Sequence, residues 1–283
     1  MVDMRVFSPS STLKYKKCHQ EYIYYKLGVQ PRILGPINYG GMFGSAMSEA
    51  MYHIHSPHLA GVDPKLVARA YVESTVEQFT SYGVSLDTQK IADMLVLLDT
   101  TIPRYMEAVL PLFTARGWHV VEAEWTVPDS GDSRIDLLCL DAASKHIIID
   151  AKWKQKVAKA EYEQQAIDSY QHDWKMKHYC YFTGLHYNET ILDYYIMLGI
   201  AAPKFKLQIV PYSVSAHEMR QWEISAKQAW ADMDDPLRPV VQAADHEDRY
   251  GLCSYHDLCF QYDGDYTDVG AMQYVQIARK PKG

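Results

Sequence analysis

The first 115 residues carry apolar side chains at steps of three and four, the spacing that places them on one face of a helix. The longest such run is 87–115, where Ile91, Met94 and Leu98 recur at this spacing and Pro103 predicts a kink. Serines and a threonine at 8–12 are candidate N-caps for a first helix. The pattern predicts a helical N-terminal part, with helices from Leu13 onward and at Phe43–His53, Pro64–Phe79 and Asp87–Ala115.

Beyond these helices the pattern changes to that of strands. Residues 118–127 alternate between apolar and polar, and 134–140 and 146–152 are almost continuously apolar. The connection at 128–133 consists of turn-forming residues, and 141–145 closes a hairpin between the second and third strands. We therefore expect three neighbouring strands in a meander.

The rest of the chain mixes the two kinds of element. We expect an α/β fold in a single domain: a helical part (1–115), a catalytic core with a small mixed sheet flanked by helices (116–215), and a last helix with a Cys-containing tail (216–283). The predicted elements are helix Lys156–Trp174, strands Tyr179–Thr183 and Phe205–Val210, and helix Ala216–Met233.

Composition and charge narrow the class of protein. The chain of 283 residues is 48% hydrophobic and 22% charged, which is ordinary for a globular protein. It has no apolar run of about 18 residues and no signal-peptide pattern, so we expect no membrane contact and a cytoplasmic location. The net charge of −7 argues against a protein-wide attraction for nucleic acid, while 22 Tyr and 6 Trp supply rings that stack on bases.

Charged residues inside the predicted strands are the most informative feature. Glu124, Asp136 and Asp150 lie one on each strand of the meander, and a carboxylate in a buried strand is costly unless it is paired or binds a metal. Lys152 follows Asp150 by two residues, so both side chains share one face of the sheet. Asp136, Asp150 and the carbonyl of Ala151 are oxygen ligands of the kind that Mg²⁺ and Mn²⁺ prefer. Lys152 would orient a water or stabilise charge on a phosphate.

A lone Asp-x-Lys tripeptide also has a simpler explanation, a strand end followed by a solvated lysine. Three features favour a site here. The run Ile147-Ile148-Ile149 is strongly strand-like. The strand before it carries Asp136, and Glu124 lies on the strand before that.

Further segments on both sides of these strands form an ordered series of motifs, and they cover much of the chain. The motifs are Phe7-Ser8-Pro9-Ser10-Ser11 with Cys18, Gly44-Ser45-Ala46-Met47-Ser48-Glu49-Ala50, Glu124, Asp136, Asp150-Ala151-Lys152, a helix with Gln164, Gln165 and Tyr170, and the segment Gly251–Cys259.

This order of motifs resembles the PD-(D/E)xK nuclease superfamily and, within it, the RecB-like exonuclease branch, which includes CRISPR-associated, AddB-like and phage enzymes. The resemblance implies a restriction-endonuclease-like core with Mg²⁺ or Mn²⁺ as the cofactor. It implies that Asp136, Asp150 and the Ala151 carbonyl hold the metal. It also implies that Lys152 and Glu124 act on the attacking water.

Two positions depart from the family pattern. Ser48 stands where the family has a metal-binding His, so it would hold the metal only through a water, and His53 is a possible substitute ligand. The family's Gln-x-x-x-Tyr helix is out of register, because Gln165 and Tyr170 are five residues apart. Both residues remain candidates for substrate binding.

Some members of the branch bind a [4Fe–4S] cluster through four cysteines. Cys18, Cys253 and Cys259 match three of the four positions, and Tyr250 occupies the remaining one. A cluster usually requires four thiolates, so simple burial of the three cysteines is the favoured interpretation and a cluster is the alternative. Disulfides are not expected in a cytoplasmic protein.

Lysines beside aromatic residues follow the Asp-x-Lys strand. Lys154 and Lys156 flank this strand's end near Trp153, and Lys175 adjoins Trp174. Such residues suit a single-strand channel, in which the charges contact phosphates and the rings stack on bases. A solvated helix face is the alternative interpretation.

The sequence therefore predicts a metal-dependent DNA nuclease, an exonuclease that acts on single strands or duplex ends in a bacterial or phage-infected cell. The family implies recombination, repair, phage DNA processing or CRISPR adaptation as contexts, with protein partners of those systems. Two alternatives remain: an inactive nuclease fold that binds DNA or a protein, which Ser48 favours, and a structure-specific endonuclease.

Overall fold

The structure is a computed structural model that divides into two compact units. We call residues 38–81 and 85–223 the sheet unit, and residues 1–37, 82–84 and 224–283 the terminal unit. The structure describes residues 6–18, 22, 29–31, 37–81, 83–131, 133–155, 164, 167–168, 170, 173–201, 205–234, 247–248, 251–252 and 274–276.

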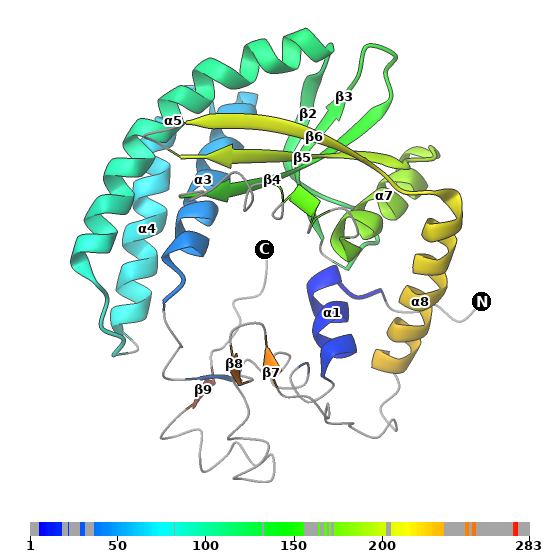
Figure 1. Cartoon of the computed structure of the whole chain (residues 1–283), viewed down its shortest axis with the longest axis horizontal. Coiled ribbons are helices and arrows are strands. Elements are labelled where there is room, and N and C mark those ends of the chain that lie inside the picture. Colours follow the sequence, from blue (N-terminus) through cyan, green and yellow to red (C-terminus); the bar gives the residue numbers. More distant parts are fainter. Residues whose placement is uncertain are drawn as a thin grey trace. The chain divides into compact units, whose positions relative to one another are not determined.

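The sheet unit is built on five strands in the order β2-β3-β4-β5-β6 (Figure 1). Neighbours pair antiparallel except β4 and β5, which are parallel. The sheet is therefore mixed, and with the helices around it the α/β prediction is confirmed. The strands are β2 (His119–Thr126), β3 (Arg134–Leu140), β4 (His146–Lys154), β5 (Asp193–Ile200) and β6 (Lys206–Ser213).

Three long helices precede the sheet and confirm the predicted helical stretch. They are α3 (Tyr39–His55), α4 (Pro64–Ser81) and α5 (Thr88–Arg116), with a short 3₁₀ turn, η1 (Pro57–Leu59), after α3. Asp87 caps the start of α5 by accepting hydrogen bonds from the Gln89 and Lys90 amides, and Gly117 caps its end in the left-handed conformation. It continues through Pro103 and Pro111, and Figure 1 shows it curving along its length.

The two faces of β4 contact different helices. The indole of Trp153 donates to the sulfur of Met51 on α3 at 3.1 Å, and its ring centre is 5.4 Å from that of Tyr105 on α5. Alternate residues of a strand point to opposite faces, so Asp150 lies on the other face, where Lys175 of helix α7 (Trp174–Tyr187) contacts it. Helices α3 and α5 therefore cover one face of β4 and α7 covers the other.

The prediction of a strand at Tyr179–Thr183 is wrong, because these residues lie inside α7. Their aromatic and β-branched side chains are typical of strands, but Asp173 accepts a hydrogen bond from the Lys175 amide and caps a helix ahead of them. Beside β3, β4 also pairs with β5, a strand that the sequence pattern did not identify. The helix predicted at 156–174 falls largely outside the described residues.

The terminal unit contains α1 (Pro9–Lys17) and short strand pairs: β1 (Val29–Pro31) with β9 (Tyr274–Gln276), and β7 (Glu247–Asp248) with β8 (Gly251–Leu252). Ser8 caps α1, as expected. Helix α8 (Ala216–Asp234) starts in the sheet unit and continues into the terminal unit. There the Trp230 indole donates to the buried Thr12 hydroxyl at 3.1 Å, which joins α8 to α1.

Within the described part of the chain, no helix combines the length and apolar character needed to cross a membrane.

Gly199 on β5 lies beside Trp153, its partner across the parallel pair. A Cβ at residue 199 would overlap the Trp153 ring, which Met51 and Tyr105 already hold in place. We expect Gly199→Ala to lower the free energy of unfolding by about 3 kcal/mol in a urea titration. Gly44→Ala, on α3 with open space around its Cβ, is the matched control and should not destabilise. Equal stabilities of the two variants would contradict this packing.

His178 on α7 is buried and fastens the β2–β3 connection. Its Nε2 lies 2.9 Å from the Ser130 carbonyl, to which the neutral ring donates, and 3.1 Å from the Ser133 hydroxyl. Burial lowers the pKa of His178 from 6.5 to about 4, although the bond to Ser130 opposes this shift. Between pH 4 and 6.5, His178 is therefore protonated in the unfolded chain but neutral in the folded chain.

The contribution of His178 to the free energy of unfolding should thus be fully present above pH 6.5, and it should decrease as the pH falls towards 4. We expect the wild-type free energy of unfolding to fall by about 2 kcal/mol more than that of His178→Gln between pH 7 and pH 5. Glutamine keeps a donor for Ser130 but does not titrate. Parallel pH dependence of the two proteins in urea titrations would contradict the assignment.

Candidate active site

Two aspartates, one buried and one half-buried, face each other on adjacent strands. Asp150 of β4 is fully buried, with an exposed fraction of 0%. Leu137 pairs with Ile149, so one further step of the register puts Asp136 of β3 opposite Asp150. The Ala151 amide donates to Asp136 Oδ2 at 2.7 Å, which fixes the Asp136 carboxylate beside the strand. The meander therefore brings both predicted carboxylates together.

Each oxygen of Asp150 carries a lysine. Lys152 Nζ forms an ion pair with Asp150 Oδ2, and Lys175 Nζ lies 3.2 Å from Asp150 Oδ1. We call Asp136, Asp150, Lys152 and Lys175 the carboxylate–lysine cluster. Two carboxylates and two ammonium groups balance in formal charge, which is how a protein makes buried carboxylates tolerable without a metal.

The pKa values within the cluster diverge. Burial alone would raise the pKa of Asp150, but Lys152 and Lys175 lower it below its usual range. Burial and the neighbouring Asp150 charge raise the pKa of Asp136 to about 6. Burial would lower the pKa of Lys175, but Asp150 raises it above its usual range. Asp150 is therefore the firmly ionised member, and Asp136 is the carboxylate on which a proton is least costly.

Glu124 on β2 has an unusual backbone conformation. Its φ is 51°, in the left-handed region that favours glycine, and the register on either side places it opposite Asp136. Arg134 Nη1 lies 3.4 Å from Glu124 Oε2. Burial, Asp136 and Glu49 of α3 raise the pKa of Glu124 to about 7, and Arg134 limits the rise. A carboxyl with this pKa both takes up and releases protons near neutral pH.

Helix α7 contributes Lys175, which the sequence suggested for a DNA channel rather than for contact with Asp150, and Tyr179, which the sequence placed in a strand. Lys175 and Tyr179 are four apart, so they share a helix face, and Lys175 Nζ lies 5.2 Å from the centre of the Tyr179 ring. This Lys-x-x-x-Tyr spacing equals that of the Gln-x-x-x-Tyr motif named above. It is the feature of the sequence that could have pointed to Lys175 and Tyr179 as site residues. Lys152 Nζ lies 5.6 Å from the ring centre of Tyr170, the aromatic residue predicted to bind substrate.

The other predicted residues that the structure describes lie on several different elements. The Ser48 hydroxyl donates to the Gly44 carbonyl at 3.2 Å, and the buried Nδ1 of His53 has no hydrogen-bond partner among the residues that the structure describes. Lys154 ends β4 and is partly buried, while Cys18 is buried in the terminal unit. Four predicted site residues lie outside the described part of the chain: Lys156, Gln165, Cys253 and Cys259.

The chemistry of the donors suits a divalent metal of the hard type. Among the described residues no group of three or more His, Cys, Asp or Glu is arranged to hold a metal ion. Asp136 and Asp150 nevertheless supply two carboxylates, and Mg²⁺ commonly binds through one or two carboxylates with water and substrate phosphates. The two ammonium groups on Asp150 show that its oxygens attract cations. The residues therefore fit Mg²⁺ or Mn²⁺ in a site with few protein ligands.

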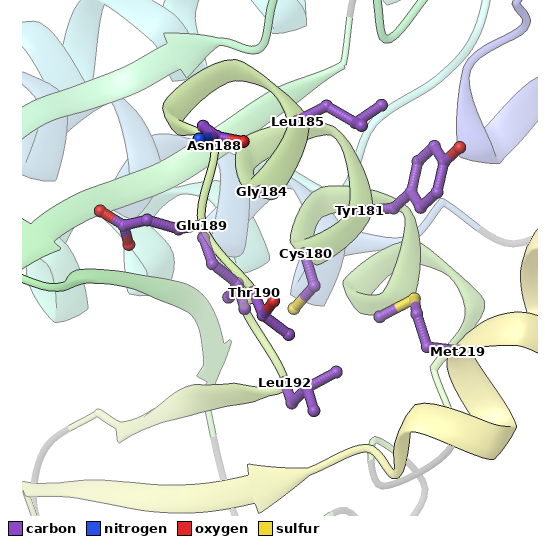
Figure 2. A pocket seen from close by; sticks show the side chains of 10 residues that line it. Cys180, Tyr181, Gly184, Leu185, Asn188, Glu189, Thr190, Leu192 and Met219 are labelled. Carbon is purple, nitrogen blue, oxygen red and sulfur yellow. The ribbon is translucent and has the colours of Figure 1, made fainter.

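A cavity of about 290 Å³ lies along the second half of α7 (Figure 2). The Glu189 carboxylate is 2.8 Å from His146 Nδ1, and burial raises the pKa of the Cys180 thiol. The cavity shares no residue with the carboxylate–lysine cluster. Its lining consists of Cys180, Tyr181, Gly184, Leu185, Asn188, Glu189, Thr190, Ile191, Leu192 and Met219.

Comparison with known proteins adds little to this geometry. No protein-family model matches the chain, and no curated protein matches it. A solved structure from Eubacterium rectale, provisionally described as an exonuclease, superposes with a TM-score of 0.44 and 11% identity over 99% of this chain and 91% of that chain. A likeness at this TM-score carries no functional argument, because function depends on the residues of a site rather than on the fold.

Proposed function

We propose that this protein is a metal-dependent deoxyribonuclease of the PD-(D/E)xK type. The observation that carries the proposal is the carboxylate–lysine cluster. Asp136 and Asp150 face each other on adjacent strands, and Lys152, two residues beyond Asp150, has its ammonium group on the same carboxylate. Buried carboxylates with perturbed pKa values beside lysines are typical of catalytic sites.

Each residue has a chemical task in this proposal. A bound Mg²⁺ or Mn²⁺ supplies a Lewis acid that polarises a phosphoryl oxygen and lowers the pKa of a water. Asp136, Asp150 and the Ala151 carbonyl would hold it. Lys152 would stabilise the negative charge that develops on the phosphate. Glu124, with a pKa of about 7, would accept a proton from the attacking water.

Linear DNA is the proposed substrate and exonucleolytic hydrolysis the proposed reaction, in recombination, repair or phage DNA processing. Tyr170 beside Lys152 adds an aromatic ring for a base next to a charge for a phosphate. A structure-specific endonuclease would use the same groups and differs only in the DNA that it accepts.

The test is hydrolysis of end-labelled single-stranded, double-stranded and closed circular DNA, in Mn²⁺ or in EDTA. We expect Mn²⁺-dependent loss of linear DNA, no loss of the circle and no loss in EDTA. Nicking of the circle would identify an endonuclease instead. Absence of cleavage in any metal, by folded protein, would refute both enzymatic functions.

A non-catalytic DNA-binding module is the second candidate, and the charge balance of the cluster favours it. Two lysines already neutralise two carboxylates, and Ser48 stands where the family has a ligand. Electrophoretic shifts with the DNA in EDTA would reveal such a module, since binding would persist where hydrolysis is absent.

A further inference from the structure

Lys175 occupies one of the oxygens that a metal at Asp150 would use. Its Nζ lies 3.2 Å from Asp150 Oδ1, and it comes from α7, while Lys152 lies on the same strand as Asp150. We propose that Lys175 is a displaceable counter-ion that competes with the divalent cation for Asp150 and thereby sets the metal affinity of the site. This inference rests on the proposed function.

The geometry allows the ammonium group of Lys175 to leave. Its side chain is 32% exposed, whereas that of Asp150 is 1% exposed. A lysine side chain has a flexible four-carbon stem, so Nζ can move several ångströms by rotation about its bonds while α7 stays in place. The Tyr179 ring already lies 5.2 Å from Nζ in the paired position, so cation–π attraction would continue to stabilise the ammonium group once it leaves Asp150.

Charge explains why the exchange is needed. The cluster balances two negative with two positive groups, so a divalent cation that enters beside both lysines adds two uncompensated positive charges in a partly buried site. Moving Lys175 away from Asp150 relieves this repulsion. A phosphate diester would then bring back negative charge, so the substrate and the metal should strengthen each other's binding.

The experiment is calorimetric titration of the full chain with MnCl₂ alone, without DNA. We expect Lys175→Gln to bind Mn²⁺ about tenfold more tightly than wild type, because the competing charge is removed while a polar, slightly shorter side chain remains. Lys175→Arg retains the charge and should stay within about twofold of wild type. Lys145→Gln, an exposed lysine in the β3–β4 hairpin, controls for the loss of one charge from the sheet unit.

Thermal unfolding with and without MnCl₂ provides a second measurement. Lys175→Gln should unfold at a lower temperature than wild type without metal, and should gain more from Mn²⁺. Circular dichroism identifies any variant that does not fold, and Lys175→Met then replaces Lys175→Gln.

The outcomes separate this inference from the proposed function. If wild type hydrolyses DNA with Mn²⁺ but Lys175→Gln binds Mn²⁺ no more tightly, only the counter-ion role is refuted. Weaker Mn²⁺ binding by Lys175→Gln than by wild type would also refute the counter-ion role alone. If neither wild type nor Lys175→Gln binds Mn²⁺ and no DNA is hydrolysed, both proposals are refuted. Mn²⁺ binding by Lys175→Gln alone would support the counter-ion role in its strongest form.

Discussion

Asp150→Asn is expected to reduce metal-dependent DNA hydrolysis by at least about a thousandfold. The substitution preserves the shape of the side chain but removes the charge that we propose holds the cation, and polarisation by a metal contributes several kcal/mol to such reactions. About 4 kcal/mol corresponds to a thousandfold in rate. Asp150 is also the cluster member that is most firmly ionised, because both Lys152 and Lys175 contact it.

Single-turnover rates with linear DNA and saturating Mn²⁺ would test this expectation. Loss of Asp150 leaves two partly buried ammonium groups without their partner, which would cost about 3 kcal/mol of stability, so circular dichroism must accompany each rate. The matched control is Asp93→Asn, at an exposed site on α5, which should keep the wild-type rate. Hydrolysis by Asp150→Asn at close to the wild-type rate would exclude the cluster as the catalytic centre.

Lys152→Met is expected to lower the rate by about a hundredfold without weakening Mn²⁺ binding. An ammonium group aimed at the charge that develops in the transition state contributes about 3 kcal/mol. Methionine has a similar length but no charge. Loss of the Lys152 ammonium group removes positive charge beside Asp150, so the affinity of the site for Mn²⁺ should rise or stay constant.

The same single-turnover assay and the MnCl₂ titration distinguish this role from a structural one. A structural lysine would change the rate and the metal affinity together. Lys145→Met, in the exposed hairpin, is the control for a loss of charge elsewhere. A wild-type rate in Lys152→Met would remove Lys152 from the mechanism.

The meander was predictable because its pattern is local. Strand β3 has the predicted bounds, and β4 extends the predicted strand by two residues to Lys154. Alternation within a strand and short connections determine which residues face each other, so Asp136, Asp150 and Lys152 could be placed together from the sequence. The left-handed backbone of Glu124 has no such local signature, because nothing in its neighbours requires it.

In the second half of the sheet, β6 overlaps the strand predicted at Phe205–Val210, but β5 was not predicted. The segment around Tyr179 has the composition of a strand, and only the Asp173 cap identifies a helix. The role of Lys175 depends on α7 crossing the face of β4, which is a tertiary arrangement. Spacing along the chain places Lys175 near Tyr179 but does not reveal that it contacts Asp150.

The parallel pairing of β4 with β5 has a consequence for the order of folding. Strands β2, β3 and β4 are joined by short turns, so they pair at a small cost in chain entropy, but β5 can pair with β4 only by closing a much longer loop of chain between them. Contacts so far apart in sequence form late. A chain folded only as far as β4 would therefore present Asp136 and Asp150 beside Lys152 but without Lys175, which α7 supplies later in the sequence.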